Sequence, residues 1–410
     1  MTTSQTTVRP RYEVDLDHHG QRFRDERPEV FKELFATGRE MVWSRVNGGY
    51  WMAFGYDAVY EIAHDTDLFS SAWGPRKGVP QVATVAPLIP LDYDPPQVGE
   101  YRKLTLPALS PGQAKKSTDS LEATAHELVD KFIESGKADL IEDLATPLPA
   151  IMILRKLGWD ESRWPEWIEW THTTMHDRMA DPDKTYRAFM KMNEQIGVEL
   201  AKRREKRTDD LTSHMMYTET ETGRLLTDDE LGNYATLLLL GGMDTTSGLT
   251  GSAFVHLAQN PQLRQQLIDH PERLPDAVEE FLRHDSPLMG LFRHVTRDTV
   301  FRGEQLREGD RIVLFFPAAG WDPNRFPEPE DVRLDRGANR HFAFGVGTHR
   351  CLGSNYARVL NEIMLKVVLE RLPDYRMLGP VDRFEDGGDI YAVRSLPVEF
   401  TSGPKIAAGP

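Results

Sequence analysis

The sequence predicts a mainly α-helical protein with small β-sheets. Helical patterns greatly outnumber strand-like pieces, and one long helical pattern with a clear start and stop signal runs through the middle of the chain. The strand-like pieces are short and scattered. A length of 410 residues is compatible with two or three domains, but no internal repeat, low-complexity tract or linker divides the chain.

The expected elements follow from local signals. Strand-like pieces occur at residues 50–54, 300–302, 311–316 and 398–401, and helical patterns at 120–135 and 164–176. Thr227-Asp228-Asp229-Glu230 fits a capping box, and the helix that it opens runs to about Gln259, before Asn260-Pro261. Pro275 suits the first turn of another helix. The last helix follows Cys351 and ends near residue 372.

Composition excludes several classes of protein. Hydrophobic residues make up 40% of the chain and charged residues 28%, as in a globular protein, and the net charge of −15 argues against nucleic acid as a partner. No apolar run approaches the ~20 residues of a membrane helix, and the polar N-terminus lacks a signal core. The single cysteine excludes an internal disulfide and points to a cytoplasmic location.

That cysteine, Cys351, lies in the segment FAFGVGTHRCLGSNYARVL. Gly345 and Gly347 allow tight turns and a close approach of the backbone to a flat group. Backbone N–H groups at the start of the following helix favour a thiolate. A lone thiolate does not suit zinc, whereas haem needs one protein ligand. The alternative from these residues alone is a buried free cysteine.

The glycines, His349 and Cys351 belong to a longer pattern, FGxGxHxCxG, filled from Phe344 to Gly353. This is the haem-binding signature of the cytochrome P-450 family, and the chain resembles its bacterial soluble members over about residues 50–400. The resemblance implies a single P-450 domain over residues 1–410, with 1–20 as a loosely ordered segment. It implies haem b (iron protoporphyrin IX) between the GGMDTT helix and the helix after the cysteine. Cys351 is then the axial iron ligand, in a cofactor-binding loop with Phe344, Gly345 and Gly353.

Glu280 and Arg283 lie three residues apart on one predicted helix, a spacing that is common by chance. They resemble the E-x-x-R pair of the family. The family completes this pair with an arginine after a stretch such as Phe326-Pro327-Glu328-Pro329, which corresponds to Arg336 here. The resemblance implies that the three residues form a structural network behind the haem.

The GGMDTT stretch, Gly241 to Thr246, lies in the middle of the long helix, where each glycine costs roughly 1 kcal/mol relative to alanine. The glycines serve either helix packing or open space for dioxygen and a substrate. The resemblance favours open space and makes Asp244 and Thr245 an acid–alcohol pair that delivers protons to dioxygen.

Haem propionates need cationic or hydrogen-bonding partners, and by resemblance these are Arg102, Arg293 and His349. Many bacterial members have a histidine four residues before the Arg102 position. This chain has Val98 there, so we expect one propionate contact to be absent or replaced.

The substrate pocket is predicted from position and apolar character, although each residue could be ordinary core. Candidates are Leu237, Leu240, Gly241, Leu288, Met289, Leu291, Phe292, Ile390, Tyr391 and the loop 73–91. They predict an apolar substrate of small to medium size, hydroxylated or oxidatively dealkylated. A terpenoid or small aromatic compound is favoured, while steroid-like, fatty and aromatic ether substrates stay open.

Electrons for this chemistry must come from outside, because no flavin or nicotinamide domain fits in the chain. We expect an acidic ferredoxin, with its reductase, to dock on the cysteine side of a monomeric protein. The candidate basic patch consists of Arg102, Lys103, Lys115, Lys116, Arg350 and Arg358.

Three other interpretations compete with the monooxygenase. They are a cysteine-nucleophile enzyme with His349 as the base, a haem-binding sensor, and a peroxide-driven member of the same family. His172 and His176 could be read as half of a metal site, but no further ligands accompany them, so we expect exposed or packed histidines.

Overall fold

The computed structural model describes residues 11–72, 87–386 and 388–406. Its helices are α1 (Gln21–Asp25), α2 (Arg27–Ala36), α3 (Tyr56–His64), α4 (Gln97–Thr105), α5 (Pro111–Lys116), α6 (Thr118–Asp130), α7 (Pro147–Leu157), α8 (Trp164–His176), α9 (Pro182–Glu205), α10 (Leu211–Tyr217), α11 (Asp228–Gln259), α12 (Pro261–Asp269), α13 (Leu274–His284), α14 (Phe316–Ala319) and α15 (Ser354–Arg371). Short helical turns are η1 (Ile133–Ser135), η2 (Ile141–Ala145), η3 (Glu161–Arg163), η4 (Pro271–Arg273) and η5 (Gly347–His349).

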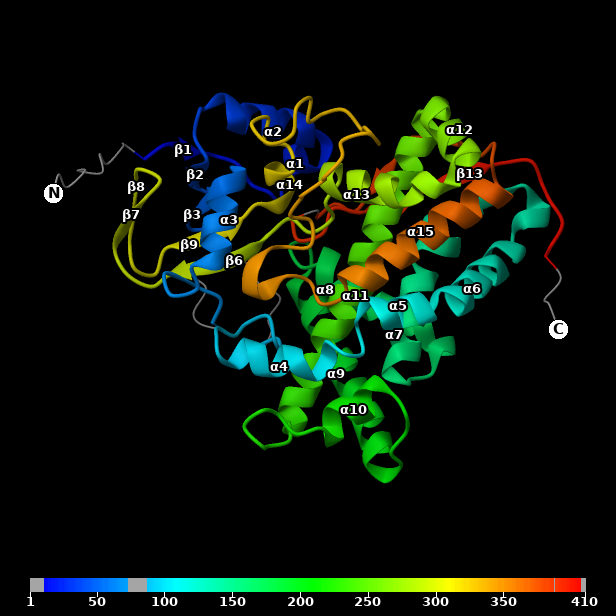
Figure 1. Ribbon diagram of the computed structural model, residues 1–410, viewed down its shortest axis with the longest axis horizontal. Coiled ribbons are helices and arrows are strands. Elements are labelled where there is room, and N and C mark those ends of the chain that lie inside the picture. The colour runs from blue at the N-terminus through cyan, green and yellow to red at the C-terminus, as the bar shows by residue number, and fades with distance from the viewer. Residues whose placement is uncertain (1–10, 73–86, 387, 407–410) are drawn as a thin grey trace.

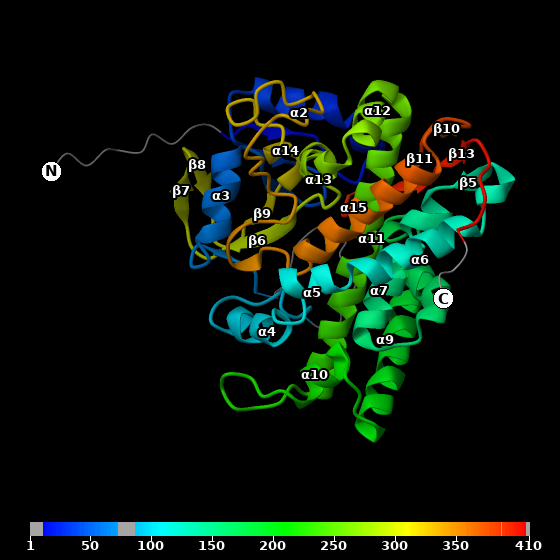
Figure 2. The same ribbon diagram turned by 45° about the vertical axis from the view of Figure 1, so that its right-hand side comes forward.

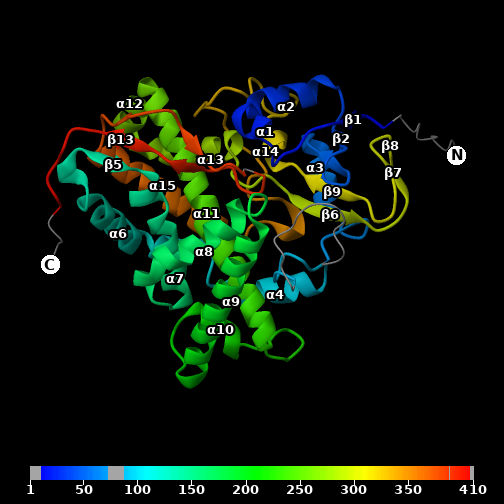
Figure 3. The ribbon, with the colours of Figure 1, turned by 180° about the vertical axis from the view of Figure 1, so that it is seen from behind.

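The strands form small sheets. They are β1 (Glu13–Val14), β2 (Met41–Ser44), β3 (Tyr50–Ala53), β4 (Phe69–Ser70), β5 (Lys137–Asp139), β6 (Leu291–Val295), β7 (Thr299–Phe301), β8 (Glu304–Leu306), β9 (Arg311–Leu314), β10 (Arg376–Met377), β11 (Asp382–Arg383), β12 (Val393–Ser395) and β13 (Pro397–Glu399). The largest sheet has the order β1-β2-β3-β9-β6-β4. In Figures 1 and 3, this sheet and helices α1 to α3 lie at one end of the molecule and the larger helical part at the other.

Helix α11 runs through the middle of the helical part, and α15 crosses beside it (Figures 1 and 2). The start of α11 is fixed by the predicted capping box. In this box the Glu230 N–H donates to Thr227 Oγ1 over 3.2 Å, and the Thr227 N–H donates to the Glu230 carboxylate over 2.8 Å. It ends at Asn260, directly before Pro261. Apolar side chains of α11, α15, α7 and α6 form the largest hydrophobic core, so α11 is fixed from several sides.

The predicted fold class is confirmed, and the differences lie at element ends. The helix predicted for 164–176 has those bounds in α8, while the helix predicted for 120–135 ends at Asp130 because the chain turns through η1 to Gly136, whose φ is 69°. The strand predicted for 311–316 ends at Leu314, since Phe316 and Pro317 open α14.

Two predicted segments are only partly covered. Residues 73–86 of the predicted loop 73–91 and residues 1–10 of the N-terminal segment lie outside the described residues. Within the described part of that segment, Glu13 and Val14 pair in parallel with β2. None of the described helices combines the length and the apolar character that crossing a membrane requires.

Candidate functional site

The loop that carries Cys351 makes two tight turns before α15. Gly345 has a φ of 64° and Gly347 a φ of 72°, values that favour glycine. A Cβ on Gly347 would lie 2.5 Å from the carbonyl oxygen of Ala63, so only glycine lets the loop pack this closely on α3. The Cys351 N–H donates to the carbonyl oxygen of Phe344 over 2.8 Å, which closes the loop.

Protein atoms surround the Cys351 thiol on most sides, but part of the side chain remains accessible to solvent. Burial raises the pKa of the thiol, while a hydrogen bond from the Gly353 N–H and the charges of Arg102, Arg350 and Arg358 act in the opposite direction. A side chain that is deep in the protein and still accessible borders open space. The thiol is therefore placed to bind a group that enters this space.

One face of α11 is accessible although most of the helix is buried. Leu237, Gly241 and Thr245 follow each other at helical spacing, and each is exposed or half-buried. A Cβ on Gly241 would meet nothing within 4 Å, whereas a Cβ on Gly242 would lie 3.3 Å from Ile153 of α7. Gly241 therefore borders open space, and Gly242 packs against a helix.

Asp244 and Thr245 are neighbours in the chain but bond to different partners. Asp244 is buried, and its carboxylate lies 2.6 Å from Nε2 of His176 and 3.4 Å from Nε2 of His172. Burial alone would raise the pKa of Asp244, but the two histidines hold it far below its usual range. The Thr245 hydroxyl donates to the carbonyl oxygen of Gly241 over 2.8 Å.

The sequence analysis did not foresee that the two histidines of α8 bind Asp244. Their spacing of four residues places both on one face of α8. A buried aspartate in the central helix needs such partners. The histidine spacing together with this aspartate was the sequence signal that could have predicted the contact.

Arg102, Arg293 and His349 come together near the cysteine loop. His349 is buried, and its Nε2 has no hydrogen-bond partner. Burial, and then the charges of Arg293 and Arg102, lower the pKa of His349 to about 3. Arg102 also donates to the Arg350 carbonyl oxygen over 2.7 Å. Val98, one turn before Arg102 on α4, is buried. Two arginines beside an unpartnered nitrogen are suited to bind carboxylates.

Glu280, Arg283 and Arg336 form one buried network. The Arg283 guanidinium donates to both Glu280 oxygens over 2.9 and 2.7 Å, and Arg336 Nε donates to Glu280 over 2.7 Å. Arg283 also donates to the carbonyl oxygens of Gly320, Pro329 and Asp331. Burial alone would raise the pKa of Glu280, yet Arg283 and Arg336 lower it. The network ties α13 to the segment that precedes the cysteine loop.

The neighbouring Glu279 holds the other side of that loop. It accepts two hydrogen bonds from Arg358 of α15, over 2.5 and 3.0 Å, and lies 3.3 Å from His341. The Arg358 guanidinium also lies 4.6 Å from the ring centre of Phe344. Two successive glutamates of α13 therefore hold the chain before and after Cys351.

The predicted pocket residues divide into two groups. Leu240, Met289, Ile390 and Tyr391 are buried, while Leu237, Leu288, Leu291 and Phe292 are half-buried and Gly241 is exposed. Leu288 and Ile390 pair as an isolated β-bridge. Met289 and Tyr391 pack into a core with the N-terminal helices. Residues 73–86 of the predicted pocket lie outside the described residues.

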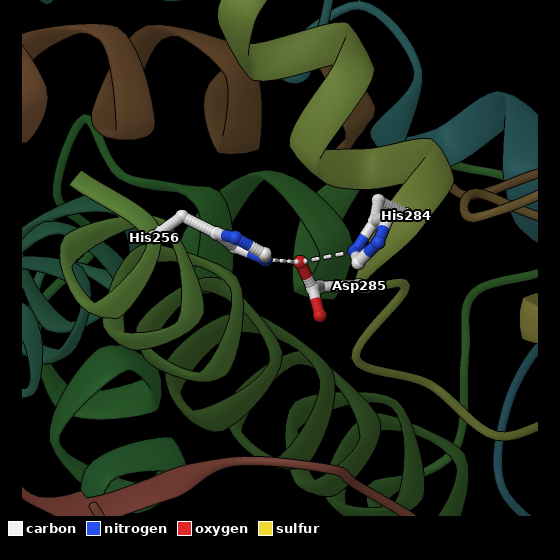
Figure 4. A group of neighbouring side chains, drawn as sticks. All are labelled: His256, His284 and Asp285. Carbon is white, nitrogen blue, oxygen red and sulfur yellow. Dashed lines mark hydrogen bonds and ion pairs between the residues drawn. The ribbon is translucent and has the colours of Figure 1, made fainter. Parts of the chain in front are cut away.

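Figure 4 shows a further group, in which Asp285 lies between His256 of α11 and His284 of α13. The three ligand-type atoms lie within 4.8 Å of one another, as in a metal site. Both histidines are hydrogen-bonded to the same Asp285 oxygen, His256 over 2.6 Å and His284 over 2.9 Å. A nitrogen that donates to Asp285 carries a proton, which it would have to release before it could bind a metal ion. The geometry is that of ion pairs that join the ends of the two helices.

The features around Cys351 fit a haem. The thiol borders open space, one face of α11 leaves room beside Gly241, and His349 has an unpartnered buried nitrogen near two arginines. An iron ligand, space for a flat group and partners for its carboxylates are all present.

Comparison with known proteins agrees with this geometry. The family model described as cytochrome P450 matches residues 162–373. A steroid C26-monooxygenase of Mycolicibacterium smegmatis is 32% identical over 383 residues, which cover 89% of this chain and 93% of the relative. The chain belongs to the cytochrome P450 family. The P450 PksS of polyketide biosynthesis in Bacillus subtilis is 31% identical, over 76% of this chain and 77% of the relative.

Solved P450 structures have the same fold. The solved structure of PksS superimposes with a TM-score of 0.85 at 27% identity, and the match covers 94% of this chain and 100% of that one. A P450 of Bacillus megaterium in complex with testosterone gives a TM-score of 0.82 at 25% identity, covering 91% and 97%.

The predicted family and enzyme class are confirmed: this chain is a cytochrome P450 monooxygenase, and the family implies a haem-iron cofactor. The two alternative interpretations, a haem-binding sensor and a cysteine-nucleophile enzyme, do not agree with the monooxygenase class. A pKa of about 3 also makes His349 a weak base for activating a thiol.

We predict that Arg283→Ala lowers the free energy of unfolding by about 3–5 kcal/mol, because it leaves Glu280 as a buried, partly unpaired charge. The control is Arg376→Ala, which removes an exposed ion pair with Glu399 and is expected to change stability little, because solvent screens that pair. Urea unfolding followed by circular dichroism measures both. Equal losses in the two variants would show that the network does not stabilise the fold.

Proposed function

We propose that this P450 inserts one oxygen atom from dioxygen into an apolar organic molecule of small to medium size, by hydroxylation or oxidative dealkylation. The observation that carries the proposal is the accessible face of α11, with Leu237, Gly241 and Thr245, in a chain whose only cysteine is also accessible. The cofactor is haem b. When bound, haem with a thiolate ligand activates dioxygen and favours cleavage of its O–O bond.

Each cofactor-binding residue has a role in this proposal. Cys351 would hold the haem iron through its sulfur, and the Gly353 N–H would stabilise the thiolate. Phe344 and Gly345 shape the loop that carries the thiolate. Arg102, Arg293 and His349 hold the propionates as charge-assisted partners, and Val98 supplies no contact of this kind.

Thr245 and Asp244 handle protons. The Thr245 hydroxyl uses its hydrogen for the Gly241 carbonyl oxygen and keeps its oxygen lone pairs free to accept a hydrogen bond from water. Asp244 supplies a carboxylate next to it in the chain. The two residues therefore organise water and pass protons on the accessible face of α11.

The substrate lies against Leu237 and Gly241 and against the half-buried residues Leu288, Leu291 and Phe292. These side chains hold an apolar molecule by its shape. Terpenoid and small aromatic compounds fit this description. The names of the relatives, a steroid C26-monooxygenase and a polyketide P450, support a test of steroid and polyketide skeletons in a screen for substrate-induced changes of the haem spin state.

An acidic ferredoxin, reduced by its own reductase, supplies the electrons. Lys115 and Lys116 of α5 and Arg350 beside the cysteine are exposed and have no carboxylate partner among the described residues. Helix α5 packs against α15, which follows the cysteine loop. Two other residues of the expected patch are already paired, Lys103 with Glu221 and Arg358 with Glu279. The docking charge therefore comes mainly from the two lysines and Arg350.

We further propose that the protein acts as a cytoplasmic monomer and that its 410 residues form one P450 domain. A single large core that joins α11, α15, α6 and α7 supports one domain. The lone cysteine is in keeping with a reducing compartment.

Thr245→Ala is expected to keep the haem and to lower the amount of product formed per electron pair, with more hydrogen peroxide released, because the hydroxyl that organises water is lost. The control is Thr246→Ala, which changes a buried neighbour on the same helix. Consumption of reduced nicotinamide cofactor, product and peroxide are measured together. Coupling equal to that of the unchanged enzyme would remove Thr245 from the mechanism.

The double variant Lys115→Glu/Lys116→Glu should slow reduction by an acidic ferredoxin by about tenfold at low salt and flatten the dependence of the rate on ionic strength. Lys32→Glu, an exposed lysine on α2, is the matched control. Stopped-flow reduction under carbon monoxide gives the rates. Docking at this patch is refuted if the double variant and the control behave alike.

A further inference from the structure

A surface pocket of about 490 Å³ is lined in part by His172, the first of the two α8 histidines that contact Asp244. Its wall includes His172 together with the apolar residues Ile168, Pro147 and Phe384. The His172 side chain is 24% exposed, while the Asp244 side chain beside it is 1% exposed. The His172 side chain therefore lies between the solvent in the pocket and the buried Asp244 carboxylate.

His176 is fixed as a cation by its hydrogen bonds. Its Nε2 lies 2.6 Å from an oxygen of Asp244, and its Nδ1 lies 3.2 Å from the carbonyl oxygen of Asp386. Both partners only accept hydrogen bonds, so both nitrogens carry protons. Burial would lower the pKa of His176, but Asp244 raises it. The ring also stacks on Phe384 at a centroid distance of 3.7 Å, and the side chain is only 2% exposed.

His172 has the opposite arrangement. Its Nε2 lies 3.4 Å from the other oxygen of Asp244, within ion-pair distance but without the alignment of a full hydrogen bond. No described residue is hydrogen-bonded to its Nδ1, and the partly exposed ring forms part of the pocket wall. His172 is thus the one titratable side chain of the described residues that contacts both Asp244 and solvent.

We propose that the protons used in the reaction reach Asp244 from this pocket through His172, while His176 keeps Asp244 in place as a carboxylate. The inference rests on the proposed function, because it assigns the supply of protons to the Asp244–Thr245 pair. His172 acts through Asp244 and is a proton-uptake residue, not a residue that touches the haem or the substrate.

The transfer is a balanced proton relay. A proton from a pocket water binds Nδ1 of His172, and the proton on Nε2 moves to Asp244, whose carboxylate becomes a carboxyl group. The ring returns to its starting form when it turns toward the pocket, Nδ1 gives its proton to a water molecule and Nε2 takes a proton from another. The charge of His176 lowers the affinity of Asp244 for protons, and the carboxyl group gives its proton to the water that Thr245 organises, which restores the carboxylate.

Other charged groups around the pocket do not replace His172. Glu142 and Asp143 come from η2, Lys131 follows α6, and Arg394 comes from β12. Arg394 is paired with Asp382 over 2.6 Å, and Asp143 accepts a hydrogen bond from the Asp139 N–H. Of the described residues that line the pocket, only His172 contacts Asp244.

The test uses the haem-loaded enzyme and the variant His172→Gln, which keeps a hydrogen-bonding side chain but cannot carry a proton. We expect product formation to fall by at least about tenfold, with a larger solvent deuterium isotope effect and more peroxide. His126→Gln is the matched control, because the His126 side chain is 21% exposed and also lies near a glutamate. A merely structural role predicts that glutamine preserves rate, isotope effect and coupling, and that result would overturn the proposal.

A second measurement needs no variant and no activity. Diethyl pyrocarbonate, with mapping of modified peptides by mass spectrometry, should modify His172 about as fast as His126 and leave His176 unmodified. Protection of His172 equal to that of His176 would contradict a path from the pocket. Failure of the proposed function is recognised separately, since the unchanged enzyme would then lack the spectrum of a thiolate-bound haem.

Discussion

Two successive glutamates of α13 hold the loop on which the site depends. Glu280 binds Arg283 and Arg336 in a buried network, and through these arginines it fixes the backbone before the cysteine loop. Glu279 binds Arg358 and so fixes the helix after it. A thiol that is to bind a metal must keep one position while the space beside it stays open. The ion pairs supply that rigidity from behind the loop, without filling the space in front of it.

Helix α11 combines two environments along one sequence. The side with Gly241 and Thr245 is accessible, while Asp244 on another side is buried against the histidines of α8. Asp244 is therefore an ionised partner of His176 in the resting protein, not a free acid beside Thr245. In our proposal the protons are held on the histidines, and Asp244 carries them only briefly.

The sequence predicted the fold class and the main helices because their signals are local. The capping box at Thr227 and the stop at Asn260-Pro261 define α11 without any knowledge of its neighbours. The cysteine loop was predicted from a dense motif with glycines whose φ values are indeed positive. Element ends were less predictable, as at Leu314, where the side chains that follow begin a helix instead of continuing the strand.

What the sequence did not predict are contacts between distant elements. The pairing of His176 with Asp244 joins α8 to α11, and that of Glu279 with Arg358 joins α13 to α15. Arg358 had been expected to serve docking, since an isolated arginine in a sequence does not reveal which carboxylate it meets. Such pairs depend on how helices pack, and local patterns carry no information on that packing.

The central claim is that Cys351 binds haem iron as a thiolate. The most direct measurement is the absorption spectrum of the purified protein after reduction under carbon monoxide, compared with that of Cys351→His. Our account predicts the strongly red-shifted Soret band of thiolate-bound haem in the unchanged protein and its loss in the variant. A colourless protein, or a red-shifted band that survives in Cys351→His, would contradict it.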